Sequence, residues 1–441
     1  MTARLAARRH VAEELPYERS VLDNGLRVVT QEMPHARSVS VALFVGVGSR
    51  HEDDAHAGLS HLLEHLVFKG TAGYPEPGAL SELIEGCGGS VNASTDRELT
   101  AYTARVPASA AATALAAVRE LVLRPLLLRR DLASEKPVII DEIRMYVDSP
   151  SDHVFTIFDE LLFGGHPLGR EIAGTPRSVR RATRELALGH WAHWYRPERM
   201  VLAVAGAIDH ASVLRLVGGW WEADGAPDAG TLAPAELLNM PPRFSPPGSL
   251  VVAHRKLSQG NLCLGMVGVS RTDPDRWALD LLGAVLGDGM SSRLFLELRE
   301  RRSLAYDVST FAASYADCGT LGVHAGFDPE RVDEVVPAIL HELDRLTQEP
   351  VAATELERAR AYTRGRLELR MEESGAVASW LGSGEILLPR IMTVAEVVEH
   401  FEAVTAEQML EVARRYLAPS QVRLALLGPF RRSPRLERLL Q

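Results

Sequence analysis

Two histidines and a glutamate lie close together in the stretch GLSHLLEHLVFKGT. The apolar residues around them predict an amphipathic helix over about residues 56–69. Because residues four apart share a helix face, the imidazoles of His61 and His65 can point at one ion. Neutral imidazole is a good zinc ligand, and two such ligands leave room for a third protein group and a water. Glu64 lies on the adjoining edge of this face, where it could accept that water's proton as general base.

The remaining ligand should come from a second helix, which the stretch SEKPVIIDEIRMYVDSP predicts. Glu135 and Glu142 are seven residues apart in it, two turns along one face. Glu142 follows His65 by 142 − 65 = 77 positions and lies beside the apolar run 138–140, which is typical of a partly buried helix. Asp141 is an alternative ligand if the register of the helix differs.

A proline near the start of this stretch restricts where the helix can begin. Pro137 has no backbone N–H and kinks a helix interior, but it is tolerated in the first turn. We therefore expect Ser134 to cap the helix, with Pro137 in the first turn. Glu135 would then stand at the helix start.

The motif H-x-x-E-H is the inverted form of the H-E-x-x-H motif of zinc proteases. For the motif alone, the alternative is an exposed helix with two incidental histidines. Glu142 taken alone could be a solvated surface carboxylate. The combination of both stretches favours a metal site.

The length and composition of the chain indicate two folded domains. The chain has 441 residues, of which 46% are apolar and 24% charged, as in ordinary globular proteins. The Pro-, Gly- and Ala-rich stretch 225–248 predicts a linker. It separates an N-terminal metal-binding domain, 1–224, from a C-terminal domain, 249–441.

Each half shows the same predicted order of elements, namely two strands, two helices, two strands and a helix. The motif ELIEGCGGSVNAST (82–95) aligns with ELRERRSLAYDVST (297–310), and YRPERMVLAVAG (195–206) aligns with YLAPSQVRLALLG (416–428). We therefore predict an α+β fold of two homologous α/β-sandwich domains from an internal duplication, each a mixed, largely antiparallel sheet packed with helices. The predicted strands are 26–30, 39–47, 90–95, 99–106, 250–253, 262–269, 304–312 and 319–327, and the predicted helices are 56–69, 78–85, 108–123, 275–286, 292–301 and 329–346.

Charge, cysteine content and hydropathy narrow the classes of partner and location. A formal net charge of −10 disfavours nucleic acid and anionic membranes as partners. Cys87, Cys263 and Cys318 lie far apart, which argues against a disulfide scaffold or a thiolate metal site. No apolar run is long enough for a bilayer, and the first residues lack the apolar segment of a signal peptide, so we expect a cytoplasmic protein.

The motif, the distal Glu142 and the preceding Glu135 together resemble the metal site of the pitrilysin and mitochondrial-processing-peptidase family of zinc peptidases. The resemblance extends over nearly the whole chain, including FKGT after the first metal helix and HPLGREIAGTP at 166–176. It implies one zinc per chain bound by His61, His65 and Glu142, with Glu64 as general base. Glu135 would be a supporting carboxylate. The counterpart of the motif in the second half, ALDLLGAVLGDG, is apolar, so one half carries the metal.

The resemblance also implies residues that face the substrate. The stretch GGSVNASTDRELTAYTARV is similar to the family's edge strand that pairs with the peptide backbone, with Asn92, Ala93 and Ser94 as contacts. An ordinary paired strand is the alternative. In the second half, SSRLFLELRERRSLAYDVS resembles the family's Arg-and-Tyr element, with Arg299 and Tyr306 able to hold a substrate carbonyl or its oxyanion.

The sequence thus predicts a zinc-dependent endopeptidase that cleaves peptides or unfolded segments inside a chamber. Larger members of the family fuse two such chains into one, so the resemblance implies that a chain of half that length forms a homodimer, or a heterodimer with a homologue. Two alternatives stay open, an inactive partner subunit and a hydrolase of a small non-peptide substrate. Such inactive subunits lack the metal motif, which this chain retains.

Overall fold

The computed structural model describes residues 17–220, 244, 248–431 and 434–440. The predicted linker and the start of the chain lie mostly outside these residues. The domain boundaries therefore stay a prediction.

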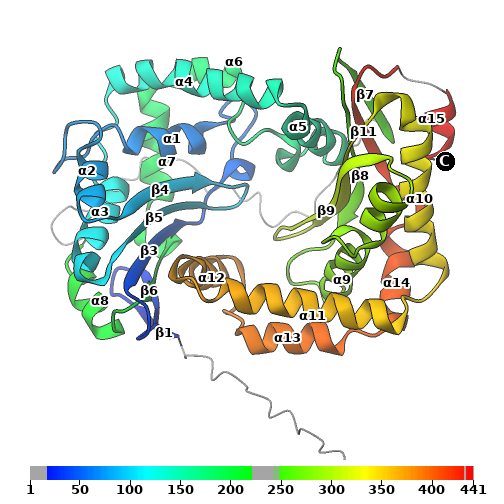
Figure 1. Cartoon of the computed structure of the whole chain (residues 1–441). Coiled ribbons are helices and arrows are strands. Elements are labelled where there is room, and N and C mark those ends of the chain that lie inside the picture. Colours follow the sequence, from blue (N-terminus) through cyan, green and yellow to red (C-terminus); the bar gives the residue numbers. More distant parts are fainter. Residues whose placement is uncertain (1–16, 221–243, 245–247, 432–433, 441) are drawn as a thin grey trace, which may run out of the picture.

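The first half forms a six-stranded sheet in the order β1-β2-β6-β3-β5-β4. Only β2 and β6 pair in parallel, and the other neighbours are antiparallel. The metal-motif helix α1 and the long helix α4 lie on one side of it (Figure 1). The bounds are β1 (Glu18–Val21), β2 (Arg27–Glu32), β3 (Ser38–Val45), β4 (Ser90–Thr95), β5 (Thr100–Pro107), β6 (Met200–Gly206), α1 (Leu59–Val67), α2 (Ala79–Gly86), α3 (Ala111–Leu123), α4 (Arg129–Asp148), α5 (Pro150–Leu162), α6 (Pro176–Arg181), α7 (Arg184–Trp194) and α8 (His210–Val217).

The second half forms a five-stranded sheet in the order β7-β11-β8-β10-β9. This order repeats β2-β6-β3-β5-β4, and its one parallel pair, β7 with β11, falls at the equivalent place. The predicted fold of two homologous α/β-sandwich domains is therefore confirmed. The bounds are β7 (Leu250–His254), β8 (Gly260–Gly268), β9 (Ala305–Ser314), β10 (Gly319–Phe327), β11 (Arg423–Gly428), α9 (Arg276–Gly287), the π-helix η6 (Phe295–Arg301), α10 (Val332–Gln348), α11 (Ala353–Arg370), α12 (Ser374–Leu387), α13 (Val394–Ala403), α14 (Ala406–Tyr416) and α15 (Pro434–Arg438).

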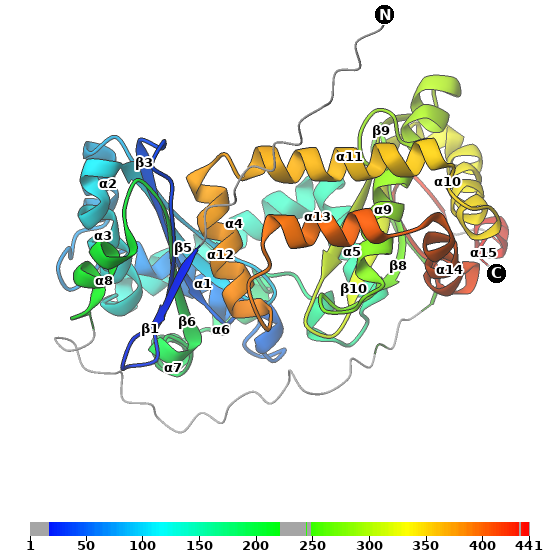
Figure 2. The same ribbon diagram turned by 90° about the horizontal axis from the view of Figure 1, so that it is seen from below.

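One helix from each half packs on the sheet of the other half. Helix α12 of the second half packs on β3, β6 and β2, and helix α5 of the first half packs on β11 and β8 (Figures 1 and 2). Strands β3 and β6 are consequently covered on both faces, which explains their nearly unbroken apolar runs. The contact is close, since a Cβ on Gly382 of α12 would lie 2.1 Å from the ring of Phe44.

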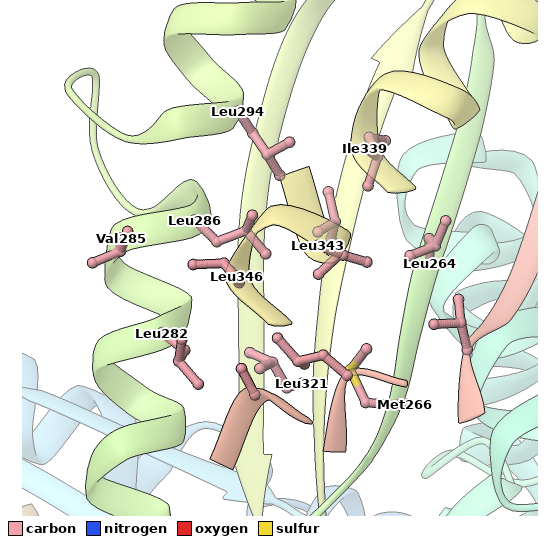
Figure 3. Close-up of a cluster of buried hydrophobic side chains, with 14 of the residues drawn as sticks. Leu264, Met266, Leu282, Val285, Leu286, Leu294, Leu321, Ile339, Leu343 and Leu346 are labelled. Carbon is pink, nitrogen blue, oxygen red and sulfur yellow. The ribbon is translucent and has the colours of Figure 1, made fainter. Parts of the chain in front are cut away.

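Each sheet buries an apolar core against its own helices. In the second half, Leu282 and Leu286 of α9 and Leu343 of α10 meet Leu264 and Leu321 of the sheet (Figure 3). Burial of such side chains contributes roughly 1.5–3 kcal/mol each to folding.

None of the helices in the described part of the chain combines the length and apolar character needed to cross a bilayer.

Candidate metal centre

Helix α1 carries the two histidines and is fixed at its N-terminus by a buried carboxylate. Glu52 accepts hydrogen bonds from the backbone N–H groups of Gly58, at 2.7 Å, and Ser60, at 2.6 Å. When ionised, the Glu52 carboxylate also complements the positive end of the helix dipole. Burial raises the pKa of Glu52 to about 7 despite these bonds. Glu52 therefore fixes the first turn of α1 through two backbone hydrogen bonds.

Helix α4 carries the third candidate ligand and starts earlier than predicted. It begins at Arg129, so Pro137 lies in its interior and Glu135 is not at its start. The prediction that Ser134 caps the helix is wrong, because its hydroxyl donates to the carbonyl of Asp131 within the helix. Pro137 and Ala133 both face solvent, so water can satisfy the Ala133 carbonyl that the proline leaves unpaired.

The side chains of His61, His65 and Glu142 converge between the two helices. One ligand atom from each lies within 4.8 Å of the others. Nε2 of His61 is 3.7 Å from Oε1 of Glu142, and Nε2 of His65 is 3.4 Å from Oε2. Two ligands of a tetrahedral zinc ion lie roughly 3.4 Å apart, so these separations fit such an ion. Burial lowers the pKa of His61 to about 4, which keeps its imidazole neutral and able to bind metal.

Glu135 supports this arrangement from behind His65. Its Oε1 lies 2.9 Å from Nδ1 of His65, and its Oε2 lies 2.6 Å from Nζ of Lys69. A carboxylate can only accept, so Nδ1 must carry the proton and Nε2 keeps its lone pair for the ion. Glu135 is 4% exposed. Its geometry is that of a group that orients a ligand.

We therefore expect Glu135→Ala to weaken zinc binding by about 10–100-fold, because His65 loses the partner that fixes its tautomer and ring orientation. Competition with a coloured chelator measures the affinity. Asp141→Ala is the matched control on the same helix, since its carboxylate is exposed and pairs with Arg144. Weaker binding in the Asp141 variant but not in the Glu135 variant would instead make Asp141 the ligand.

Glu64 lies beside the three candidate ligands and is held by the neighbouring strand. The hydroxyl of Thr95 donates to its Oε2 at 2.5 Å. Burial raises the pKa of Glu64, and the Thr95 hydrogen bond opposes that shift. The carboxylate is therefore fixed in one orientation, as a proton acceptor for a metal-bound water needs to be.

The predicted substrate-contact residues lie on an edge of the first sheet. Strand β4 pairs only with β5, and its other side has no neighbouring strand among the described residues. Asn92 and Ser94 are exposed, whereas Ala93 packs toward the core beneath α1. An extended peptide could add to this free edge.

Arg299 and Tyr306 lie together, but on the second half. The guanidinium of Arg299 is 5.8 Å from the centre of the Tyr306 ring, and both line a cavity of about 420 Å³. None of the four residues at the candidate metal centre lines this cavity. Arg299 belongs to a π-helix where an α-helix was predicted, and Ser303 after it has a positive φ of 49°. Both features are frequent at functional sites.

The sequence analysis did not identify three residues that support the candidate metal centre, namely Thr95, Lys69 and Glu52. Strand alternation could have placed Thr95 on the same face as Ala93, toward the metal helix. Lys69 follows His65 by one helical turn, which indicates a shared face. The role of Glu52 depends on a loop conformation that has no local sequence signal.

Both halves of the chain match known protein families. Residues 27–176 match the family described as insulinase, peptidase family M16, and residues 181–362 match the peptidase M16 inactive domain. An uncharacterized zinc protease of Streptomyces coelicolor is 36% identical over 420 residues, which are 94% of this chain and 90% of that protein. The uncharacterized zinc protease YmxG of Bacillus subtilis is 32% identical over 415 residues, 93% of this chain and 98% of that protein.

Solved structures show the same fold. A protease from Helicobacter pylori superposes with a TM-score of 0.86 at 22% identity, covering 94% of this chain and 99% of that one. A peptidase M16 inactive domain from Pseudomonas fluorescens gives a TM-score of 0.83 at 21% identity, covering 95% of this chain and 98% of that one.

In the second half of this chain, the buried helix α9 occupies the place of α1 and carries no histidine pair.

Proposed function

The chain belongs to peptidase family M16, and on that premise we propose that it is a zinc-dependent endopeptidase that cleaves peptides or unfolded segments. The observation that carries the proposal is the convergence of His61, His65 and Glu142 with Glu64 beside them. Family membership and the zinc-protease relatives support a zinc peptidase. The cleavage of internal peptide bonds and the roles of single residues are our own inferences from the site.

Each residue of the centre has a distinct role in this proposal. His61, His65 and Glu142 would hold one zinc ion, which when bound lowers the pKa of a water and polarises the scissile carbonyl. Glu64 accepts the water's proton and delivers it to the leaving amine. Glu135 keeps His65 in the tautomer that leaves Nε2 free, and Lys69 neutralises the charge of Glu135.

The free edge of β4 suits a substrate of varied sequence. The backbone groups of residues 92–94 would hydrogen-bond to an extended peptide and align it across the centre. Such main-chain bonds place no demands on the side chains of the peptide. A folded protein keeps most of its backbone hydrogen bonds within its own structure and so offers few such strands. The proposed substrates are therefore peptides and unfolded segments.

We propose a homodimer in which Arg299 and Tyr306 of one subunit complete the centre of the other. Within one chain the pair lines a cavity away from the metal residues, although Tyr306 is 77% exposed and free to meet a ligand. Two facing subunits would enclose a chamber, and a homologous chain could replace one of them. The cytoplasm stays the predicted compartment.

A single substrate in two states tests the proposed activity. A small disulfide-bonded protein is incubated with the enzyme either native or after reduction and alkylation, and mass spectrometry locates the cuts. We expect internal cleavage of the unfolded form alone, which a chelator abolishes. Removal of terminal residues only would contradict an endopeptidase. No cleavage by the zinc-loaded protein would favour an inactive subunit or a hydrolase of small molecules.

A further inference from the structure

Four charged side chains meet where the two halves of the chain touch. Nη1 of Arg50 lies 2.5 Å from Oε1 of Glu98, and the Arg50 guanidinium binds Asp317 through two bonds of 3.1 and 2.8 Å. Arg271 donates to the other oxygen of Glu98. The side chains of Arg50 and Glu98 are only 3% and 6% exposed, and those of Arg271 and Asp317 are 12% and 13% exposed. We call these four residues the Glu98 cluster.

The Glu98 cluster holds the turn between β4 and β5. Oε1 of Glu98 also accepts a hydrogen bond from the backbone N–H of Ala316 at 3.0 Å. The second half therefore binds the turn through both backbone and side-chain groups. On the other side, the N–H of Arg50 donates to the carbonyl of Arg97 at 2.9 Å. The approach is tight, because a Cβ on Gly48 would lie 2.2 Å from the carbonyl oxygen of Asp96.

This turn directly follows the residue that holds the catalytic base. Thr95 is the last residue of β4 and bonds the Glu64 carboxylate at 2.5 Å. Only Asp96 and Arg97 separate it from Glu98. A continuous set of contacts therefore runs from Arg271 and Asp317 in the second half to Glu64.

The Glu98 cluster is one of several contacts between the halves. Helices α5 and α12 already bury apolar cores across the junction, and Arg19 pairs with the buried Glu385 of α12. Buried ion groups contribute little net stability, because desolvation offsets their attraction, but they impose a defined geometry. What the cluster adds is a fixed position for the turn.

We propose that the Glu98 cluster and Thr95 position the Glu64 carboxylate, so that the general base is correctly placed only while the two halves are docked. The proposal rests on the proposed function of Glu64. Thr95 and Glu98 are positioning residues in it. They act on the rate of the chemical step and not on the metal.

The test compares zinc-loaded variants by kcat, KM and zinc content. We expect Thr95→Val and Glu98→Gln each to lower kcat at least tenfold, with zinc content and KM close to wild type. Thr95→Ser, which restores the hydroxyl, should recover most of the rate. Because both changes act through one contact, the double variant Thr95→Val with Glu98→Gln should be no slower than the worse single variant.

Glu385→Gln is the matched control, since it removes another buried inter-half charge far along the chain from Thr95. We expect it to lower thermal stability without the loss of kcat. An equal loss of kcat in this control, or multiplicative losses in the double variant, would overturn the proposal. Where Glu98→Gln does not fold, Asp317→Asn at the edge of the cluster takes its place.

A second readout does not depend on activity. Hydrogen exchange of the amides in residues 90–99 should speed up in Glu98→Gln and stay at the wild-type rate in Glu385→Gln. Unchanged exchange in both variants would contradict the positioning role. If the wild-type protein cleaves no peptide, the proposed function fails, and this exchange experiment still decides whether the cluster fixes the turn.

Discussion

Replacing Glu64 by Gln should lower kcat by about 10²–10⁴-fold while zinc binding stays at the wild-type level. The amide keeps the shape of the side chain and can still accept the hydrogen bond from Thr95, which lies at 2.5 Å in the wild type. It cannot take a proton from the water, so general-base catalysis is lost. Peptide hydrolysis and zinc analysis on one preparation measure both quantities.

Glu142→Gln is the partner experiment, because its side chain approaches both histidines, at 3.7 and 3.4 Å. A neutral amide is a poor zinc ligand, so this variant should lose metal first and activity as a result. Excess zinc should restore part of its rate but none of the rate of Glu64→Gln. Swapped phenotypes would reverse the two assignments.

Activity should reappear when two inactive variants exchange subunits. One carries Glu64→Gln, and the other carries Arg299→Ala with Tyr306→Phe. In a dimer with shared sites, the mixed species joins an intact metal centre to an intact Arg299 and Tyr306 pair, so one of its two sites works. A statistical mixture contains about half mixed dimers, which predicts roughly a quarter of wild-type activity.

Subunit exchange has to be shown independently, by mass spectrometry of isotope-labelled chains. The separate variants, kept unmixed, give the baseline. If exchange is complete and the mixture stays at that baseline, each site is built within one subunit and the composite site is excluded. The exposed position of Tyr306 would then need another explanation.

Local sequence predicted the part of the site that depends on helical spacing. His61, Glu64 and His65 share a helix face because of their separation alone, and Glu142 was identified by its place beside an apolar run. The cap at Ser134 was predicted wrongly, since the rule that keeps proline in a first turn ignores solvent. Pro137 faces water, and its missing hydrogen bond costs less there.

Contacts between distant segments could not be predicted from the sequence. Apolar faces on α5 and α12 indicate burial but do not say which sheet covers them, and each helix packs on the other half. The bond from Thr95 to Glu64 and the Glu98 cluster arise from the same tertiary arrangement. Nor does a single sequence distinguish the π-helix at Arg299 from an α-helix, since the two differ in hydrogen-bond register.

Stepwise addition of zinc to the metal-free protein, with peptide hydrolysis measured at each step, tests the central claim most directly. The described residues hold one cluster of three side chains that could bind a metal, and the proposed function places one zinc ion there. The rate should therefore rise linearly from near zero and level off at one equivalent of zinc per chain. Full hydrolysis by the metal-free protein, or a rate that does not follow bound zinc, would contradict the claim that His61, His65 and Glu142 hold the catalytic metal.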